Sequence, residues 1–523
     1  MGNRMLTRVI AAGLMLAGWC NAQVPDEPLA PVGPLPLADP APGRPQRYEL
    51  GDTFTSEAAG ISFRGPGNCI ELKRSNSEQL VQFVNEEMKW SMSVGRVLLS
   101  KPMRLIASDG PQGRRIPGLL ESTIEQIKVD APGAEILRED FVNIGDAEVG
   151  MIVVRSTVGM DTRLTQRALV RGSDLVYYNF TFISPAPRQG PLENDLETQK
   201  VVDLFGRVID TVRVMDQSRL KEEQNERLYR TRAVLLNFSE ARLRDALAPE
   251  QWWRLIRDGK DIGYSYVVEE VANDLPRRGV PLDAVRGTEG VRIGVRSRTY
   301  PESGAQVDSE SWLYASFDRR NEVWSSTGLI EQKDGTRESF GEFGTADREV
   351  RRVIDPRLAP GELLPDGTAD ANQPPVRPTE VYMLTVTRNS KTMRGQTLER
   401  QLPPFYLPQA LNHLLPRILP YHEPKTYLFA TWIGDQGEVV KRYIDVGAEQ
   451  YFTLDGRRQR AIPIADRIGV EGAVTTHYVS PEGRYLGSQN EASKILILTT
   501  DKPTLEKIWK DANLTRPAEI EGK

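Results

Sequence analysis

Residues that commonly carry chemistry are scarce in this 523-residue sequence, which has two cysteines and three histidines. If Cys20 is removed with a leader, Cys69 has no partner for an intrachain disulfide, so stability has to come from packing. We expect Cys69 to be a buried small hydrophobic residue and not a reactive thiol. The spacing of His413, His422 and His477 does not fit a helical zinc pair, so neither a metal site nor a cofactor is predicted.

Common catalytic and nucleotide-binding motifs are missing as well. The sequence has no G-x-S-x-G elbow, dinucleotide fingerprint or paired-cysteine metal pattern. Asp258-Gly259-Lys260 has a single glycine and no helix after it, so we interpret it as a hairpin turn and not as a phosphate loop. We therefore predict a non-enzymatic protein, with a hydrolase that cleaves envelope polymers through a carboxylate pair as the alternative. A net charge of −5 without a basic tract argues against a nucleic-acid partner.

No apolar run is long enough to cross a bilayer, which takes about 20 residues. The best candidate, residues 9–19, is short and follows Arg4 and Arg8, and small residues come after it. This pattern predicts an export signal that is cleaved after Ala22, and therefore a periplasmic or extracellular protein without a transmembrane span. The sequence "LAGWC" also resembles a bacterial lipoprotein signal, although a tryptophan precedes the cysteine. Lipidation of Cys20 and anchoring to the membrane are the alternative.

Composition divides the chain into segments, because proline-rich and charged stretches separate regions with strand and helix patterns. The predicted segments are a signal peptide (1–22), a proline-rich linker (23–47), an α/β domain (48–215), a helical linker (216–248), an antiparallel β domain (249–515) and a tail (516–523).

The first predicted domain, residues 48–215, combines short strands with two helices. "ISFRGPGNCIEL" and "KWSMSVGRVLL" are rich in β-branched and aromatic residues, which is typical of strands. "PGLLESTIEQIKV" and "KVVDLFGRVIDTV" repeat apolar residues at steps of three and four, which is typical of helices. This order of elements resembles the PsbP-like α/β/α sandwich. The resemblance implies a non-catalytic accessory or partner-binding module.

The second predicted domain, residues 249–515, is dominated by strands. Asp-Gly turns recur, and segments such as "VRIGVRSR" alternate apolar and charged residues, which predicts an antiparallel meander bent into a large curved sheet or partial barrel. The apolar segment 403–424 is expected to cover the open side of that sheet. This arrangement resembles the LolA/LppX-type envelope half-barrels, which enclose an apolar cavity, and it implies handling of lipids. The predicted class of the whole chain is α+β.

Aromatic residues are concentrated in the first strands of the second domain and in the apolar segment. They can be ordinary core packing, or they can line a cavity for an acyl chain. The predicted ligand-binding residues are Trp253, Tyr264, Trp312, Tyr314, Trp324, Phe405, Tyr406 and Leu411. The functional hypothesis is an exported, non-enzymatic cell-envelope protein that binds a hydrophobic ligand, such as a lipid or acyl chain, or a protein partner. A purely structural envelope protein is a further alternative.

Overall fold

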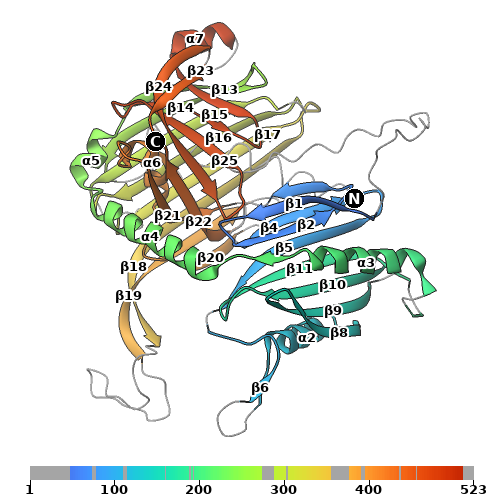
Figure 1. Cartoon of the computed structure of the whole chain (residues 1–523). Coiled ribbons are helices and arrows are strands. Elements are labelled where there is room, and N and C mark those ends of the chain that lie inside the picture. Colours follow the sequence, from blue (N-terminus) through green and yellow to red (C-terminus); the bar gives the residue numbers. More distant parts are fainter. Residues whose placement is uncertain are drawn as a thin grey trace, which may run out of the picture. The chain divides into compact units, whose positions relative to one another are not determined.

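The computed structural model describes residues 48–73, 78–99, 101–109, 115–158, 161–187, 190–191, 194–273, 288–301, 304–354, 376–389, 395–434, 437–454 and 456–509. The predicted leader with Cys20, the proline-rich linker and the C-terminal tail lie outside the described residues. Large antiparallel sheets and a few helices make up the regular structure (Figure 1), with 55% strand and 18% helix. The predicted α+β class is confirmed.

Two compact units divide the chain inside helix α4 (Gln217–Leu236), between Glu226 and Arg227. The short segment Ile468–Ala473 groups with the first unit. The charged sequence of α4 is free of glycine and proline, which favours a continuous helix.

In the first unit an antiparallel sheet lies between two helices. Its strand order is β3-β4-β5-β11-β10-β9-β8. The elements of this unit are β1 (Leu50–Ser56), β2 (Ile61–Pro66), β3 (Ile70–Lys73), β4 (Gln79–Asn85), β5 (Trp90–Leu98), β6 (Ser108–Asp109), β7 (Arg115–Ile116), α2 (Leu119–Asp130), β8 (Glu135–Ile144), β9 (Ala147–Val158), β10 (Asp161–Arg171), β11 (Val176–Pro185), α3 (Leu196–Asp210) and β12 (Arg213–Val214). Strands β1, β2 and β12 form a separate small sheet.

The two helices of this unit cover opposite faces of the sheet, as the side chains of β11 demonstrate. Tyr177 lies in the apolar cluster under α2, whereas Phe182 contacts Phe205 of α3 with ring centroids 5.9 Å apart. Because successive side chains of a strand point to opposite faces, odd and even positions of β11 serve the two helices separately. The side chain of Asp195 accepts a hydrogen bond from the Thr198 N–H (3.0 Å) and caps the start of α3.

The second unit is a single large antiparallel sheet of 15 strands with short helices. Its order is β20-β19-β18-β17-β16-β15-β14-β13-β27-β26-β25-β24-β22-β21, and β23 pairs with β24. The elements are β13 (Glu250–Arg257), β14 (Lys260–Ala272), β15 (Gly290–Thr299), β16 (Gln306–Ser316), β17 (Glu322–Glu331), β18 (Arg337–Ile354), β19 (Val376–Asn389), β20 (Gln396–Gln401), β21 (Lys425–Ile433), β22 (Glu438–Val446), β23 (Gln450–Leu454), β24 (Arg457–Ile468), β25 (Val474–Val479), β26 (Tyr485–Asn490), β27 (Ile495–Thr500), α5 (Glu240–Asp245), α6 (Gln409–Ile418) and α7 (Lys502–Ile508).

Turn chemistry positions the first hairpin of this sheet. Asp258 and Gly259 both have positive φ (48° and 75°), and Arg257 pairs with Lys260 across the turn. Two consecutive positive φ values define the turn type that Asp-Gly favours in two-residue hairpins. The interpretation of Asp258-Gly259-Lys260 as a turn is confirmed.

The segment that follows β20 joins the two ends of the curved sheet. Leu407 N donates to Ala430 O of β21 (2.9 Å), and Ala430 N donates to Phe405 O (3.0 Å). Helix α6 begins directly afterwards and contacts β15, β16, β21 and β25, which lie far apart in the strand order. The sheet therefore wraps around α6.

Candidate functional site

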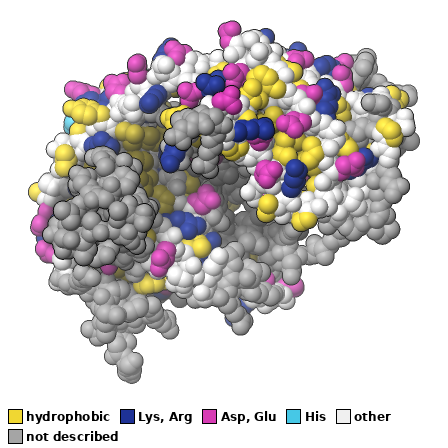
Figure 2. Space-filling model, turned by 90° about the horizontal axis from the view of Figure 1, so that it is seen from below, with side chains coloured by type: hydrophobic (Ala, Val, Ile, Leu, Met, Phe, Trp, Pro, Cys, Tyr) yellow, Lys and Arg dark blue, Asp and Glu magenta, His cyan; other side chains and the backbone are white. Residues whose placement is uncertain are grey.

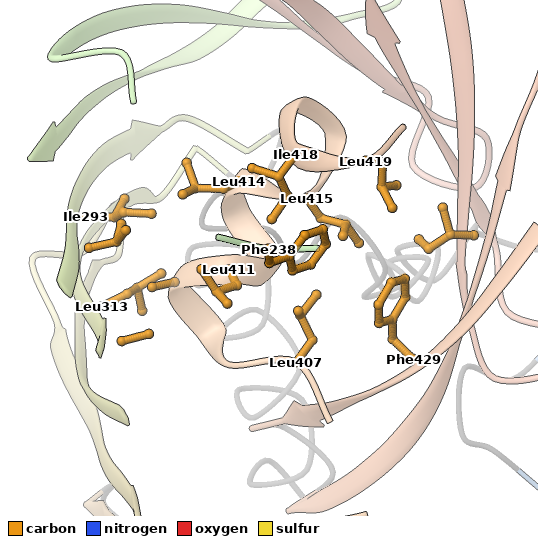
Figure 3. Close-up of a cluster of buried hydrophobic side chains, with 14 of the residues drawn as sticks. Phe238, Ile293, Leu313, Leu407, Leu411, Leu414, Leu415, Ile418, Leu419 and Phe429 are labelled. Carbon is orange, nitrogen blue, oxygen red and sulfur yellow. The ribbon is translucent and has the colours of Figure 1, made fainter. Parts of the chain in front are cut away.

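Helix α6 fills the concave side of the curved sheet with aliphatic side chains. Leu411, Leu414, Leu415 and Ile418 recur at steps of three and four, and each is at most 1% exposed. Figure 3 shows them between strand residues of the sheet, with Ile293 and Leu313 on one side and Phe429 on the other. The space that an acyl chain would need is occupied by the protein's own side chains.

The polar face of α6 is buried as well, and the sheet and neighbouring loops provide its partners. Gln409 Nε2 donates to the carbonyl oxygen of Trp432 (3.2 Å). Asn412 Nδ2 donates to Thr431 Oγ1 (2.6 Å), and Asn412 Oδ1 accepts a hydrogen bond from Arg442. A buried polar group without a partner is costly, so these contacts specify one position for the helix.

Glu269, on the inner face of β14, is the centre of the first buried ion network. Its carboxylate accepts hydrogen bonds from Arg417 Nη1 (2.9 Å), Arg417 Nη2, His413 Nε2 (2.9 Å), Gln251 Nε2 (2.8 Å) and the Ala248 N–H (2.8 Å). Burial acts to raise the pKa of Glu269, but Arg417 and His413 outweigh it and hold the pKa at about 2. The ionised carboxylate joins α6 to two segments of the sheet wall.

Asp466 on β24 is the centre of a second network. It accepts from Arg442 Nε (2.9 Å) and from His477 Nε2 (3.3 Å), and the Tyr485 hydroxyl lies 3.2 Å from His477 Nδ1. Burial acts to raise the pKa of Asp466, and Arg442 and His477 together lower it to about 2. His413 and His477 thus occupy buried structural positions.

Glu322 is a third buried carboxyl group, and it lies at the N-terminus of α6. Pro408 precedes the helix and offers no side-chain cap, so Glu322 accepts a hydrogen bond from the Gln409 N–H instead. Burial raises the pKa of Glu322 to about 8, although the Gln409 N–H and the Tyr406 hydroxyl act to lower it. At neutral pH this carboxyl group is therefore mostly protonated, unlike those of Glu269 and Asp466.

An open pocket of about 900 Å³ lies beside the C-terminal end of α6, and we call it the α6 pocket. Its lining comes from the α5 region, the start of β13, the end of α6, the hairpin before β26 and the end of β27. The lining residues are Asn237, Ser239, Arg242, Asp245, Ala246, Leu247, Ala248, Glu250, Gln251, Trp252, Arg417, Leu419, Pro420, Tyr421, His422, Glu482, Gly483, Arg484, Tyr485, Thr499 and Thr500. Arg417 and Gln251 connect this pocket to Glu269.

The structure brings together five of the eight predicted ligand-binding residues. Trp253, Trp324, Tyr406 and Leu411 belong to the cluster around α6, and Phe405 packs against it. The other three residues, Tyr264, Trp312 and Tyr314, lie in clusters separate from the one around α6.

Strand alternation explains this separation. Successive side chains of a strand point to opposite faces of the sheet, and these three aromatic residues occupy the positions that face away from α6. Leu313 points to α6, so its neighbours Trp312 and Tyr314 point away from it. In the same way, Glu269 and Tyr264 of β14 point to opposite faces. Tyr264, Trp312 and Tyr314 therefore point away from α6.

Sequence reasoning missed the charged residues of the interior, Glu269, Arg417, Arg442 and Asp466. The available signal was weak. Glu269 follows Ser265 and Val267 on the inward positions of β14, so it is a carboxylate on an otherwise small or apolar face. Such a residue is buried only with a charged partner.

Cys69 lies in an environment that differs from the predicted one. Cys69 is half-buried and not fully buried; its thiol donates to the Pro66 carbonyl oxygen (2.9 Å), and burial raises its pKa to about 11.

In the described part of the chain, no group of three or more His, Cys, Asp or Glu side chains is arranged to hold a metal ion. No described helix combines the length and apolar character needed to cross a membrane. On the face drawn in Figure 2, basic and acidic side chains are interspersed.

No known protein family and no curated protein matches this sequence. Three solved structures are similar to parts of the chain. Cyanobacterial PsbP (CyanoP) from Synechocystis sp. PCC 6803 is 15% identical, with a TM-score of 0.24, and the match covers 31% of this chain and 91% of that one. A β-barrel-like protein of the domain of unknown function DUF1849 from Brucella abortus is 12% identical, with a TM-score of 0.27 and coverages of 48% and 94%. A protein from Bacteroides thetaiotaomicron is 12% identical, with a TM-score of 0.20 and coverages of 42% and 87%.

Likeness at this level establishes no function. The PsbP-like and LolA-type resemblances stay predictions. What the structure itself defines is a class: a two-unit α+β protein whose second unit is a curved antiparallel sheet around a buried helix.

Proposed function

We propose that this protein is an exported, non-enzymatic component of the cell envelope that binds a protein partner at the α6 pocket. The leader-like pattern at residues 1–22 supports export. The observation that carries the proposal is the burial of α6 inside the curved sheet, because the helix fills the interior around it while a pocket stays open beside its C-terminal end.

Binding of a lipid inside the sheet would require α6 to leave. Each buried Leu or Ile side chain contributes about 1.5–3 kcal/mol, so exposing Leu411, Leu414 and Leu415 alone costs roughly 5–9 kcal/mol. Breaking the buried pair of Glu269 and Arg417 costs several kcal/mol more. An acyl chain that arrives from a bilayer is already out of water, so its transfer gains little to offset these terms. The hydrophobic-ligand alternative is therefore the weaker one.

The two ion networks of the described interior do not suit catalysis. Glu269 and Asp466 are each held by one arginine and one histidine, which leaves neither as a free acid or base. Glu322, the third buried carboxyl group, accepts a hydrogen bond from the start of α6 and does not line the α6 pocket. The hydrolase alternative is therefore the weaker one.

The lining of the α6 pocket suits a protein partner. Aromatic side chains and charges of both signs gather there, including Tyr421, Arg484 and Glu482. Arginine and aromatic residues are enriched in protein interfaces, where they combine apolar area with directed hydrogen bonds.

Site-specific photo-crosslinking in cells that export the full chain tests this proposal. A photoreactive residue is placed at His422 or at Arg484 on the pocket, and at the exposed Tyr451 as a control. We expect the same crosslinked envelope protein from both pocket positions and none from the control. Crosslinks from all three positions alike, or a cytoplasmic protein, would contradict the proposal. Native mass spectrometry that finds one lipid per chain would favour the hydrophobic-ligand alternative instead.

A further inference from the structure

Arg417 has two of its five N–H donors left over. Its Nη1 donates to the Ala246 carbonyl oxygen (2.8 Å) and to Glu269 Oε2 (2.9 Å), and its Nη2 donates to Glu269 Oε1. Within the described part of the chain, the Nε–H and the second Nη2–H make no hydrogen bond. The side chain is only 8% exposed, yet it contributes to the lining of the α6 pocket. Because Arg417 lines the open pocket, these two unused N–H groups are available to a ligand there.

Gln251 has an unused hydrogen-bond acceptor next to these donors. Its Nε2 donates to Glu269 Oε1 (2.8 Å), which fixes the orientation of the amide and directs Oε1 away from that carboxylate. No hydrogen bond to Gln251 Oε1 is made by the described residues. Because Gln251 and Arg417 bind the same oxygen of Glu269, a fixed acceptor and a fixed donor lie next to each other in one pocket.

We propose that the α6 pocket binds an extended peptide segment through one residue's backbone N–H and C=O. The N–H donates to Gln251 Oε1, and the C=O accepts from the unused Nε–H and Nη2–H of Arg417. This inference rests on the proposed function and specifies how the partner is recognised. The N–H and the C=O of a single residue in an extended chain point to the same side, as in a hydrogen-bonded pair of an antiparallel ladder. An N-acetyl group of a glycan carries its N–H and C=O on opposite sides of one trans amide. It therefore fits the pair of groups less well.

The charges around the pocket suit a peptide too. Arg242, Arg484 and Asp245 line the pocket, and none of them makes an ion pair within the described residues. Side chains of either sign that flank the bound residue can pair with them, whereas an uncharged glycan would leave them without partners.

The test begins with a random heptapeptide phage library that is selected on the purified full chain. Synthetic copies of the selected peptides are then measured by calorimetry, along with analogues that carry one backbone N-methyl group at successive positions. A tetramer of N-acetylglucosamine is the glycan probe. We expect peptide binding that one particular N-methylation weakens about tenfold or more, the effect of losing one ligand hydrogen bond.

Variants of the two pocket residues test the assignment. Arg417→Lys keeps a cation for Glu269 but removes the Nε–H, and Gln251→Lys keeps a donor for Glu269 but removes the acceptor. Each is expected to weaken peptide binding about tenfold, whereas Gln489→Leu on the outer face of β26 leaves it unchanged. Thermal unfolding of each variant separates a loss of binding from a loss of folding, and the N-methyl series needs no variant.

Three results would overturn the inference: no selected peptide binds the unaltered chain, the variants bind as well as that chain does, or the glycan binds in competition with the peptides. If crosslinking still captures an envelope partner at the pocket, the proposed function stands and only this mode of recognition fails. If crosslinking also fails, the proposed function fails with it.

Discussion

The indole nitrogens of Trp324 and Trp432 donate to the same carboxylate oxygen, Oε1 of Glu342, at 3.2 and 3.0 Å. Trp324 is on β17 and Trp432 is on β21, at the far end of the strand order, so Glu342 of β18 connects distant parts of the sheet. The three side chains hold together the end of the wall at which the segment after β20 meets β21.

Replacing Glu342 should therefore loosen the wall. Glu342→Leu leaves both indole N–H groups without this acceptor, and we expect the free energy of unfolding to fall by about 2–4 kcal/mol. Urea unfolding followed by tryptophan fluorescence measures the change. Glu331→Gln, which breaks a surface pair with Arg337, is the control and should alter stability by less than about 1 kcal/mol. Equal effects of the two substitutions would refute the connecting role of Glu342.

The network of Glu269 predicts that the free energy of unfolding depends strongly on both Glu269 and Arg417. Arg417→Met leaves a buried carboxylate without its main cation, and we expect a loss of about 3–5 kcal/mol in the free energy of unfolding. The double variant with Glu269→Gln removes the charge as well and should recover a large part of that loss. A double-mutant cycle in urea measures the coupling. Additive effects would mean that the two groups do not depend on each other.

The raised pKa of Glu322 predicts that the free energy of unfolding falls as the pH rises. Its pKa in the folded chain, about 8, lies above the ordinary value of 4.5, so the folded state binds this proton more tightly than the unfolded state. The contribution is fully present below about pH 4.5 and is lost as pH rises through about 8, with a total effect on the order of 5 kcal/mol. We expect Glu322→Gln to flatten this part of the profile. Urea unfolding from about pH 5 to about pH 9 checks it. Parallel profiles for the two proteins would contradict the burial of an isolated carboxyl group.

The lowered pKa values of Glu269 and Asp466 predict that the free energy of unfolding falls as the pH is lowered in acid. Their pKa values in the folded chain, about 2, lie below the ordinary values of 4.5 and 3.8, so their contribution is present above those values. It is lost as pH falls through about 2. We expect the second unit to remain folded at about pH 4 and to unfold only in stronger acid, as circular dichroism can follow. Unfolding near pH 4 would show that these ion networks are not formed in solution.

The sequence predicts what depends on local pattern. Asp258 and Gly259 specify their hairpin because few other pairs tolerate two positive φ values, and the stripe from Val201 to Ile209 specifies the buried face of α3. The same pattern could not predict which ring faces α6, since neighbours such as Trp312 and Leu313 are both bulky and apolar. A shift of one residue in the strand would exchange the two faces, so the local pattern does not decide which of them points inward.

The interior networks were beyond prediction for a different reason. Arg417 and Glu269 are 148 residues apart in sequence, and the residues around either one do not indicate that the other is its partner. Burial of α6 on all sides is likewise set by the closure of the sheet, which depends on the contact between Phe405–Leu407 and β21. An amphipathic segment by itself is compatible with a surface lid as well as with a central helix.

Hydrogen exchange of the α6 amides, those of Asn412 to Leu415, Arg417 and Ile418, in the full chain tests the central claim most directly. A fixed central helix predicts exchange that occurs only through global unfolding, as slow as in β15 and β16, and unchanged when phospholipid vesicles are added. Faster exchange of α6 than of those strands, or exchange that accelerates with vesicles, would show that the helix leaves the sheet and would contradict the claim.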